Sequence, residues 1–351
     1  MAAATAAKVN GLLVTHLPDV RYLCGFTGSN AVLLLTGSGA VLFTDGRYVA
    51  QARAEAVGTR VVISKKAALT AACEWMERTG VERCGFDATH TTVIALEGMR
   101  RAVSSKVRRR AFQPVGSMVG RLREVKDKDE ISLMRAAAAL GCRLFEGMLG
   151  LIEPGMTEIA VAAELEYKAR LGGAEGMSFE TIVASGPRSA LPHGRATTAK
   201  LPRQGFVTLD FGVMLDGYSS DMTRTVHLGK ALPAELEVYE AVLEAQEAAL
   251  AVVAAGVTAG EVDEAARSVL RQAKLDRFFT HSTGHGLGLE IHEGPRLAAK
   301  QTQELVEGMV ITIEPGVYMP GRFGVRIEDM VLVTRTGSEV LTPSLKAWIQ
   351  L

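Results

Sequence analysis

One stretch, Phe206–His227 (FVTLDFGVMLDGYSSDMTRTVH), constrains the fold more than any other. Two runs of alternating apolar residues flank Asp216 and Gly217, a dipeptide typical of a two-residue β-hairpin turn. With this turn, Leu215 faces Tyr218, and the pairing of all residues further from the turn follows. The stretch therefore predicts two paired antiparallel strands.

The predicted hairpin brings two carboxylates together. Asp210 faces Thr223, and Asp210 and Asp221 fall on the same face as diagonal neighbours, which lie roughly 7–8 Å apart in such a pair. Buried like charges repel one another and become protonated unless a cation neutralises them. The simpler alternative is one buried, hydrogen-bonded aspartate and one aspartate near the turn. The remaining motifs favour a cation site.

The composition excludes some classes of protein. Apolar residues make up 48% of the 351 residues, and Lys+Arg and Asp+Glu are both 39, so no net charge favours a nucleic-acid or membrane partner. The four cysteines form no CxxC pair and are typical of a reducing compartment. The start, MAAATAAKVN, lacks the apolar core of a signal peptide. No apolar run reaches the roughly 18 residues of a membrane span. We expect a soluble cytoplasmic protein.

The pattern of elements divides the chain in two. Strand-like and helical runs alternate over residues 10–86, which predicts a small α/β domain. The pattern lapses between Ala111 and Gly120, so we expect an N-terminal domain over 1–120 and a second domain over 121–351. Apolar residues at three- and four-residue steps predict a helix over 131–149, and Thr157 is a good N-cap for the next helix. With two more predicted helices around a mostly antiparallel sheet, the second domain is α+β.

Further polar residues follow the hairpin. The segment HSTGHGLGLEIHE carries His281, His285 and His292, three of the seven histidines of the chain, among glycines that allow close backbone approach. VITIEP and VRIED then place Glu314 and Glu328 among alternating apolar residues, each on the face opposite the apolar side chains. Taken singly, each glutamate would be an exposed strand residue. Arg326 shares the Glu328 face and is suited to orienting carboxylates by charge-assisted hydrogen bonds.

Together these motifs make a candidate metal site. It combines four carboxylates and one imidazole: Asp210, Asp221, His285, Glu314 and Glu328. Without metal, so many acidic groups on inner strand faces would carry an unsupportable negative charge, whereas two divalent cations about 3.5–4 Å apart would neutralise it. An oxygen-rich set with one histidine suits Mn²⁺ or Co²⁺, with Zn²⁺ or Fe²⁺ as alternatives.

The arrangement resembles the pita-bread dinuclear metallopeptidases, which include methionine aminopeptidase, aminopeptidase P and prolidase. The segments LDFGVMLDGYSSDMTRT, HSTGHGLGLEIHE, IEPG and RIED match in order, and none of the family's five ligands is missing. LPDVRYLCGFTGSN and TDGRY resemble the small N-terminal domain of the prolidase, aminopeptidase P and creatinase branch. The resemblance implies a pita-bread catalytic domain after a creatinase-type domain, in a homodimer.

The resemblance also implies roles for individual residues. Asp221 and Glu328 would bridge the two metals, Asp210 would complete one coordination sphere, and His285 and Glu314 the other. Glu314 could also act as the general base.

Two histidines outside the ligand set match catalytic positions of the family. His193, in SALPHG, and His292 match histidines that contact the scissile amide and stabilise the tetrahedral intermediate. The simpler alternative for His193 is a surface loop residue. His281 resembles a position behind the ligands.

The expected substrate is a small peptide with proline after the scissile bond. Arg296 matches an arginine that resembles a carboxylate clamp in some prolidases, which favours Xaa-Pro dipeptides, although an exposed loop arginine is the simpler alternative. The candidate substrate-binding residues are His281, Arg296, Arg326 and, across a dimer, Arg47. Aminopeptidase P activity on longer peptides is the second hypothesis. A third is a non-catalytic binding protein on this fold.

Overall fold

A computed structural model describes residues 8–108 and 110–351. The first seven residues, on which the expectation about a signal peptide partly rests, lie outside this range. The chain forms two compact units, the first ending at Arg123 and the second beginning at Glu124. The assignment of 1–120 and 121–351 as separate domains stays a prediction.

The N-terminal unit is built on a six-stranded mixed sheet with the order β4-β3-β2-β1-β5-β6. Its strands are β1 (Gly11–Val14), β2 (Val32–Thr36), β3 (Gly39–Asp45), β4 (Thr59–Ser64), β5 (Cys84–Asp87) and β6 (Phe112–Val115). Its helices are α2 (Leu17–Cys24), α3 (Val49–Glu55), α4 (Ala68–Arg78), α5 (Val93–Ala102) and α6 (Met118–Arg123). The alternation of strands and helices is the one expected from the sequence.

The predicted lapse between Ala111 and Gly120 is wrong. β6 pairs in parallel with β5 in this segment, and α6 begins at Met118. Pro114 obscured the strand, because proline cannot donate to a sheet ladder. It is tolerated here because β6 is the edge strand of the sheet.

The C-terminal unit combines two helix pairs with short antiparallel strands. The helices are α7 (Lys128–Leu149), α8 (Glu158–Leu171), α9 (Pro233–Val252) and α10 (Ala259–Gln272). The strands are β7 (Gly176–Met177), β8 (Ile182–Ser185), β9 (Gly205–Phe211), β10 (Val213–Leu215), β11 (Tyr218–Ser219), β12 (Met222–Leu228), β13 (Gly284–Gly286), β14 (Glu293–Leu297), β15 (Val310–Ile313), β16 (Gly316–Met319), β17 (Phe323–Arg326), β18 (Asp329–Val333) and β19 (Ser338–Val340). All pairings between these strands are antiparallel, which confirms the α+β prediction.

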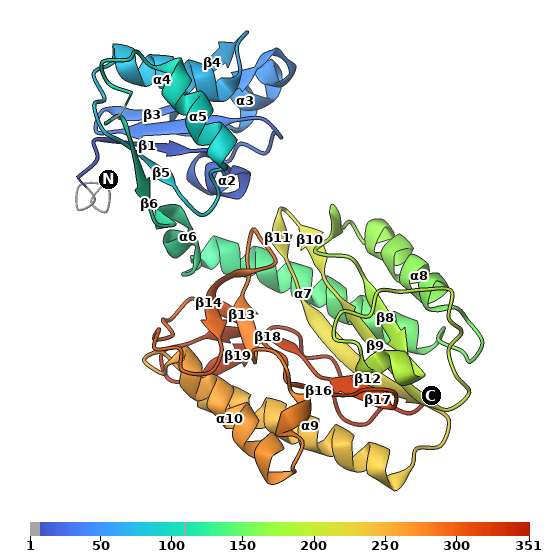
Figure 1. Ribbon diagram of the computed structural model, residues 1–351. Helices are drawn as coiled ribbons and strands as arrows, with labels where there is room; N and C mark the ends of the chain where they lie inside the picture. The colour runs from blue at the N-terminus through green and yellow to red at the C-terminus, as the bar shows by residue number, and fades with distance from the viewer. Residues whose placement is uncertain (1–7, 109) are drawn as a thin grey trace. The chain divides into compact units, whose positions relative to one another are not determined.

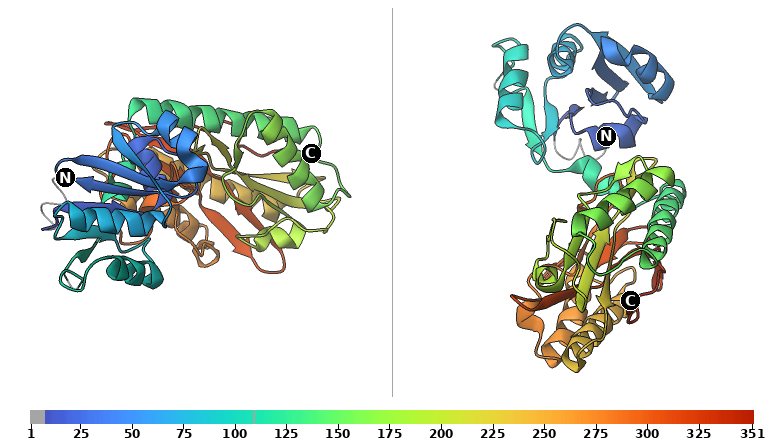
Figure 2. Two further views of the ribbon diagram at one scale, coloured as in Figure 1. Left: turned by 90° about the horizontal axis from the view of Figure 1, so that it is seen from above. Right: turned by 90° about the vertical axis from the view of Figure 1, so that its right-hand side faces the viewer.

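Hydrophobic cores hold the strands of this unit between the helix pairs, and a smaller one packs Met134 and Ala138 of α7 against β15 and β18. α9 and α10 pack against β15, β16, β17 and β18, whereas α7 and α8 pack against β8, β9, β10 and β12. The helix pairs therefore lie on opposite sides of the strands, as Figures 1 and 2 show. No helix in the described part of the chain is long and apolar enough to cross a lipid bilayer.

Local signals in the sequence cap the first two helices of this unit, although α7 begins at Lys128, three residues before the predicted start. Thr157 caps α8 by accepting a hydrogen bond from the amide of Ala160, as predicted. Asp127 begins α7 with a reciprocal capping box that uses Glu130. All four cysteines are free and buried, as small core residues.

The predicted hairpin register is confirmed. Leu215 pairs with Tyr218 in β10–β11, and Asp210 pairs with Thr223 in β9–β12. Asp216 and Gly217 have φ angles of 48° and 77°, the positive values that this turn requires at both positions.

Gly212 separates β9 from β10, at a point where this arm of the hairpin lies very close to Ser220 on the opposite arm. A Cβ atom added there would lie 1.7 Å from the carbonyl oxygen of Ser220. Only glycine permits this approach without movement of the backbone next to Asp221.

We expect Gly212→Ala to destabilise the protein by about 1–3 kcal/mol, because the new methyl group overpacks the hairpin. The measurement is chemical denaturation. Gly147→Ala is the matched control, because Gly147 lies in α7 with open space around it and should gain roughly 0.5–1 kcal/mol from the change. Equal stability of Gly212→Ala and wild type would contradict the close approach.

Candidate active site

A cavity of about 610 Å³ opens among the strands of the C-terminal unit. Its wall includes all of the site residues predicted from the sequence except Arg47: His193, Asp210, Asp221, His281, His285, His292, Arg296, Glu314, Arg326 and Glu328. Phe179, Ile182 and Ile291 add apolar surface. The cavity is thus acidic on one side and partly apolar elsewhere.

Strand pairing explains why the five candidate ligands converge. Asp210 lies on β9, and Asp221 directly precedes β12, which pairs with β9. His285 lies on β13, beside β15, and Glu314 directly follows β15. Glu328 directly precedes β18, and its amide donates to the carbonyl oxygen of Thr223 on β12 (3.1 Å), which joins the two sheets at the site.

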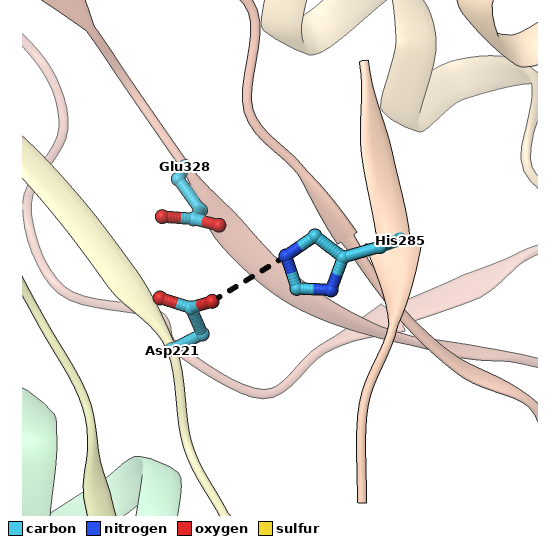
Figure 3. A group of neighbouring side chains, drawn as sticks. All are labelled: Asp221, His285 and Glu328. Carbon is cyan, nitrogen blue, oxygen red and sulfur yellow. Dashed lines mark ion pairs between the residues drawn. The ribbon is translucent and has the colours of Figure 1, made fainter. Parts of the chain in front are cut away.

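Asp221, His285 and Glu328 form the tightest group, shown in Figure 3. One ligand atom from each lies within 4.8 Å of the others. His285 Nδ1 donates to the carbonyl oxygen of Gly286 (2.9 Å), so Nε2 presents its lone pair to the carboxylates. Nε2 lies 3.7 Å from Asp221 Oδ2 and 3.6 Å from Glu314 Oε1, too far for hydrogen bonds. Two ligand atoms bound to one cation by bonds of about 2.1 Å would lie roughly 3.0–3.4 Å apart. The observed separations are only slightly longer, so the side chains are close to the spacing that a shared cation requires.

An unpaired oxygen supports the same conclusion. Asp221 Oδ1 is buried and has no hydrogen-bond partner among the described residues. An unpaired carboxylate oxygen is costly away from water unless a cation satisfies it. The donor set of oxygens and one imidazole therefore fits a divalent metal ion.

Burial opposes ionisation of the carboxylates. Burial raises the pKa of Asp221 well above its usual value, and the charge of Glu328 raises it further. Burial and the charge of Glu328 likewise raise the pKa of Glu314. Burial, with the charge of Asp210, raises the pKa of Glu328 to about 8. A nearby divalent ion would reverse these shifts by favouring the charged forms.

Arg326 orients one of the carboxylates, as predicted from its strand face. Its Nη2 donates to Asp210 Oδ2, and its Nε donates to Thr223 Oγ1 (3.1 Å). The Thr223 hydroxyl in turn donates to Glu328 Oε2 (2.7 Å). The Nη1 group donates to Tyr318 Oη (2.7 Å) and to the carbonyl oxygen of Pro192 (3.1 Å). The role of Arg326 in substrate binding stays a prediction.

His281 lies on the cavity wall and is joined to Arg326 through Tyr318, and its assignment to a place behind the ligands stays a prediction. Its Nδ1 donates to the carbonyl oxygen of Ser282 (2.8 Å), so Nε2 accepts from the hydroxyl of Tyr318 (2.8 Å). Burial lowers the pKa of His281 to about 4, which keeps the ring neutral and this bond intact at pH 7.

Three further side chains of the cavity are accessible to a substrate. His193 and His292 are exposed, and the His292 ring lies 4.5 Å from the ring of His285. Arg296 lies opposite His285 on β14 and is exposed. Its guanidinium makes no hydrogen bond or ion pair with any residue that the structure describes, so it is free to bind an anionic group. The roles assigned to these residues stay predictions.

Arg47 belongs to the N-terminal unit, in the 3-10 turn Gly46–Tyr48. It forms a two-pronged ion pair with Asp45, with both N–O distances 2.9 Å, and its side chain is 69% exposed. Contact between Arg47 and a substrate stays a prediction.

Sequence reasoning missed several residues that hold the site in place. Tyr318 links Arg326 to His281, and Thr223 holds Glu328. Glu158, a fully buried carboxylate in the first turn of α8, was also missed. Its only sequence signal is an acidic residue directly after an N-cap, which is common at helix N-termini.

Comparisons with known proteins agree with the motifs. Residues 132–335 match the model of metallopeptidase family M24, and residues 2–125 match that of the creatinase/prolidase N-terminal domain. A Xaa-Pro dipeptidase of Pyrococcus horikoshii is 34% identical over 95% of this chain and 93% of its own. The structure of a Xaa-Pro dipeptidase from Bacillus anthracis is 40% identical, with a TM-score of 0.96 over 100% of this chain and 97% of the other. That of an X-Pro aminopeptidase from Thermotoga maritima is 34% identical, with a TM-score of 0.91 over 100% of both chains.

Without metal, we expect the free energy of unfolding to fall as pH rises from about 6.5 to about 8. The raised pKa of Glu328 means that the folded state binds more protons than the unfolded state up to about pH 8. His281 and His285, with pKa values lowered to about 4, act in the opposite direction, but only below about pH 6.5. Urea unfolding in a chelator at pH 6.5 and 8 measures the slope.

Glu328→Gln provides the control for this slope, because it removes one of the groups that titrate in the window. Saturation with Mn²⁺ should also flatten the slope, because the ion favours the charged carboxylates. If the free energy of unfolding in the chelator stays level or rises between pH 6.5 and 8, the carboxylates are not buried together as the structure has them.

Proposed function

The chain belongs to metallopeptidase family M24 and carries a creatinase/prolidase N-terminal domain, and from this premise we propose that it hydrolyses Xaa-Pro dipeptides. Membership confirms the predicted enzyme class, the use of divalent metal and the pita-bread fold. The observation that carries the proposal is a single cavity that combines the five candidate ligands with Arg296, an exposed arginine. The P. horikoshii and B. anthracis relatives named Xaa-Pro dipeptidase support it.

We propose two divalent ions at the site, Mn²⁺ or Co²⁺ before Zn²⁺ or Fe²⁺. Asp221 and Glu328 would hold both ions, Asp210 would complete the shell of one, and His285 and Glu314 that of the other. Bound there, such ions polarise the scissile carbonyl and lower the pKa of a water molecule.

The residues of the chain supply the proton transfers and the orientation of the substrate. Glu314, which lies on the cavity wall among the candidate ligands, would accept the proton of the attacking water as the general base. His193 and His292 present ring nitrogens from exposed positions on the cavity wall to the scissile amide. Arg326 holds Asp210 in place by its hydrogen bond.

The preference for proline and for a short substrate follows from two features. The proline nitrogen has no hydrogen to donate, so its ring requires apolar contact rather than a hydrogen-bond acceptor. In a dipeptide the carboxylate follows proline directly, and Arg296 offers a planar fork that suits a carboxylate.

A second candidate function is removal of the N-terminal residue from longer Xaa-Pro peptides. The fold match to the T. maritima X-Pro aminopeptidase over the whole chain favours it. The non-catalytic binding protein considered above is ruled out by membership of this metallopeptidase family together with the retained candidate ligand residues. Homodimer formation and a cytoplasmic location stay predictions.

The length of the substrate separates the two candidate functions. We expect rapid cleavage of Ala-Pro and slow cleavage of Ala-Pro-Ala, because only the dipeptide places its carboxylate next to proline. The measurement is kcat/KM for both peptides with Mn²⁺, Co²⁺ and Zn²⁺ in turn. Rapid cleavage of Ala-Pro-Ala alone would favour the aminopeptidase.

Arg296→Ala should raise the KM for Ala-Pro by about 10-fold or more, because a charge-assisted hydrogen bond to the carboxylate contributes roughly 1.5–3 kcal/mol. The matched control substrate is Ala-Pro amide, which lacks the carboxylate. Its KM should be the same for wild type and for Arg296→Ala. An unchanged KM for Ala-Pro would dismiss the clamp.

A further inference from the structure

The segment that carries His193 is a loop between two strands of the C-terminal unit. It leaves β8 at Ser185, forms the short 3-10 helix Gly186–Ala190 and passes His193. At Thr197 the chain lies beside the first turn of α8, before it continues to β9. His193 itself is exposed, and among the residues that the structure describes its ring has no hydrogen-bond partner; its backbone carbonyl accepts from the amide of Arg195 (2.9 Å). The position of its ring therefore depends on what holds the loop.

One buried carboxylate holds both ends of this loop. Glu158 Oε1 accepts hydrogen bonds from the amide (2.9 Å) and hydroxyl (3.0 Å) of Ser185, where the loop begins. Glu158 Oε2 accepts from the amide (3.1 Å) and hydroxyl (2.7 Å) of Thr197, where the loop ends. The side chain of Glu158 is 0% exposed, so water does not compete for these bonds.

An arginine within the loop completes the same arrangement. Arg188 Nε donates to both oxygens of Glu158, at 3.2 and 3.0 Å. Its Nη2 donates to the carbonyl oxygen of Arg195 (2.7 Å), two residues beyond His193. Glu158 thus fixes the two ends of the loop directly and the segment after His193 through Arg188.

The opposite side of the loop contacts the metal-site wall. Arg326 Nη1 donates to the carbonyl oxygen of Pro192, and the same side chain binds Asp210 through Nη2. Ser189 Oγ accepts from the amide of Gly324 on β17 (2.8 Å). The loop is therefore held between α8 and the strands that carry the candidate ligands.

We propose that Glu158 is a positioning residue that sets the place of His193 in the cavity, an inference that rests on the proposed function. It makes no contact with the cavity and acts only through the loop. Because both of its oxygens accept from backbone amides, it requires a carboxylate. A glutamine at this position would turn its NH₂ group toward either the Ser185 or the Thr197 amide and lose the side-chain bond to that end of the loop. Backbone bonds, such as that from the amide of Ile159 to the carbonyl oxygen of Thr197 (2.9 Å), would remain, so we expect the loop to loosen rather than to detach.

The test is a pair of double-mutant cycles on Ala-Pro hydrolysis. Glu158→Gln alone should lower kcat/KM by roughly 10–100-fold, as expected for a misplaced catalytic group. In the His193→Ala background the same change should have no further effect, whereas in the Arg296→Ala background it should keep its full effect. Equal losses in both backgrounds, or no loss at all, would overturn the proposal.

Two further measurements separate positioning from a general loss of structure. The affinity for Mn²⁺ should not change in Glu158→Gln, because Glu158 lies on α8 and its side chain bonds to Ser185, Arg188 and Thr197 rather than to a candidate ligand; a weakened affinity would contradict the proposal. The matched control is Glu164→Gln, the same change on the same helix at a surface ion pair with Lys168, which should leave kcat/KM unchanged.

Milder variants cover the case in which Glu158→Gln does not fold. Thr197→Val and Ser185→Ala each remove one hydroxyl donor, and both should show the same dependence on His193. Amide hydrogen exchange of residues 186–196 should be faster in these variants, a result that needs no substrate. If wild type does not cleave Ala-Pro but the exchange result holds, the proposed function fails while the hold of Glu158 on the loop stands. Unchanged exchange would refute that hold.

Discussion

Electrostatic repulsion among Asp210, Asp221, Glu314 and Glu328 is the constraint on which the catalytic unit depends. Arg326 supplies one positive charge against four potential negative ones, through its bond to Asp210. Burial raises the pKa of the other three carboxyl groups, so without a cation the site can relieve the repulsion only by taking up protons. Divalent metal resolves the conflict and turns an unfavourable cluster into a site for hydrolysis.

The fold opposes this repulsion by fixing the backbone on every side of the site. Next to Glu328, the side chain of Arg224 is only 1% exposed. Its guanidinium donates to the carbonyl oxygens of Thr223 and Glu328 and to the carboxylate of Asp329. A second arginine, Arg326 on β17, donates to the hydroxyl of Tyr318, which in turn donates to His281. The ligand-bearing segments cannot separate without breaking these buried bonds, and those that the two arginines donate are charge-assisted and strong where water is excluded.

The sequence predicts those parts of the site that local patterns encode. The Asp216-Gly217 turn sets the register that places Asp210 opposite Thr223. The VITIEP and VRIED motifs indicate Glu314 and Glu328 as candidates, but both lie just outside β15 and β18, so alternation within a strand does not set their positions. Residues whose role comes from hydrogen bonds to residues far away in the sequence could not be found in this way. Glu158 meets Thr197, and Tyr318 meets His281, across 39 and 37 residues of chain with no periodic signal between them. The short strand β6 was hidden by its own proline.

Anomalous X-ray diffraction from crystals loaded with Mn²⁺ tests the central claim most directly, because it locates the ions independently of activity. The account predicts two anomalous peaks in the cavity, one touching Asp210 and the other touching His285 and Glu314, with Asp221 and Glu328 contacting both. Crystals at saturating Mn²⁺ that show no peak among these side chains would contradict it.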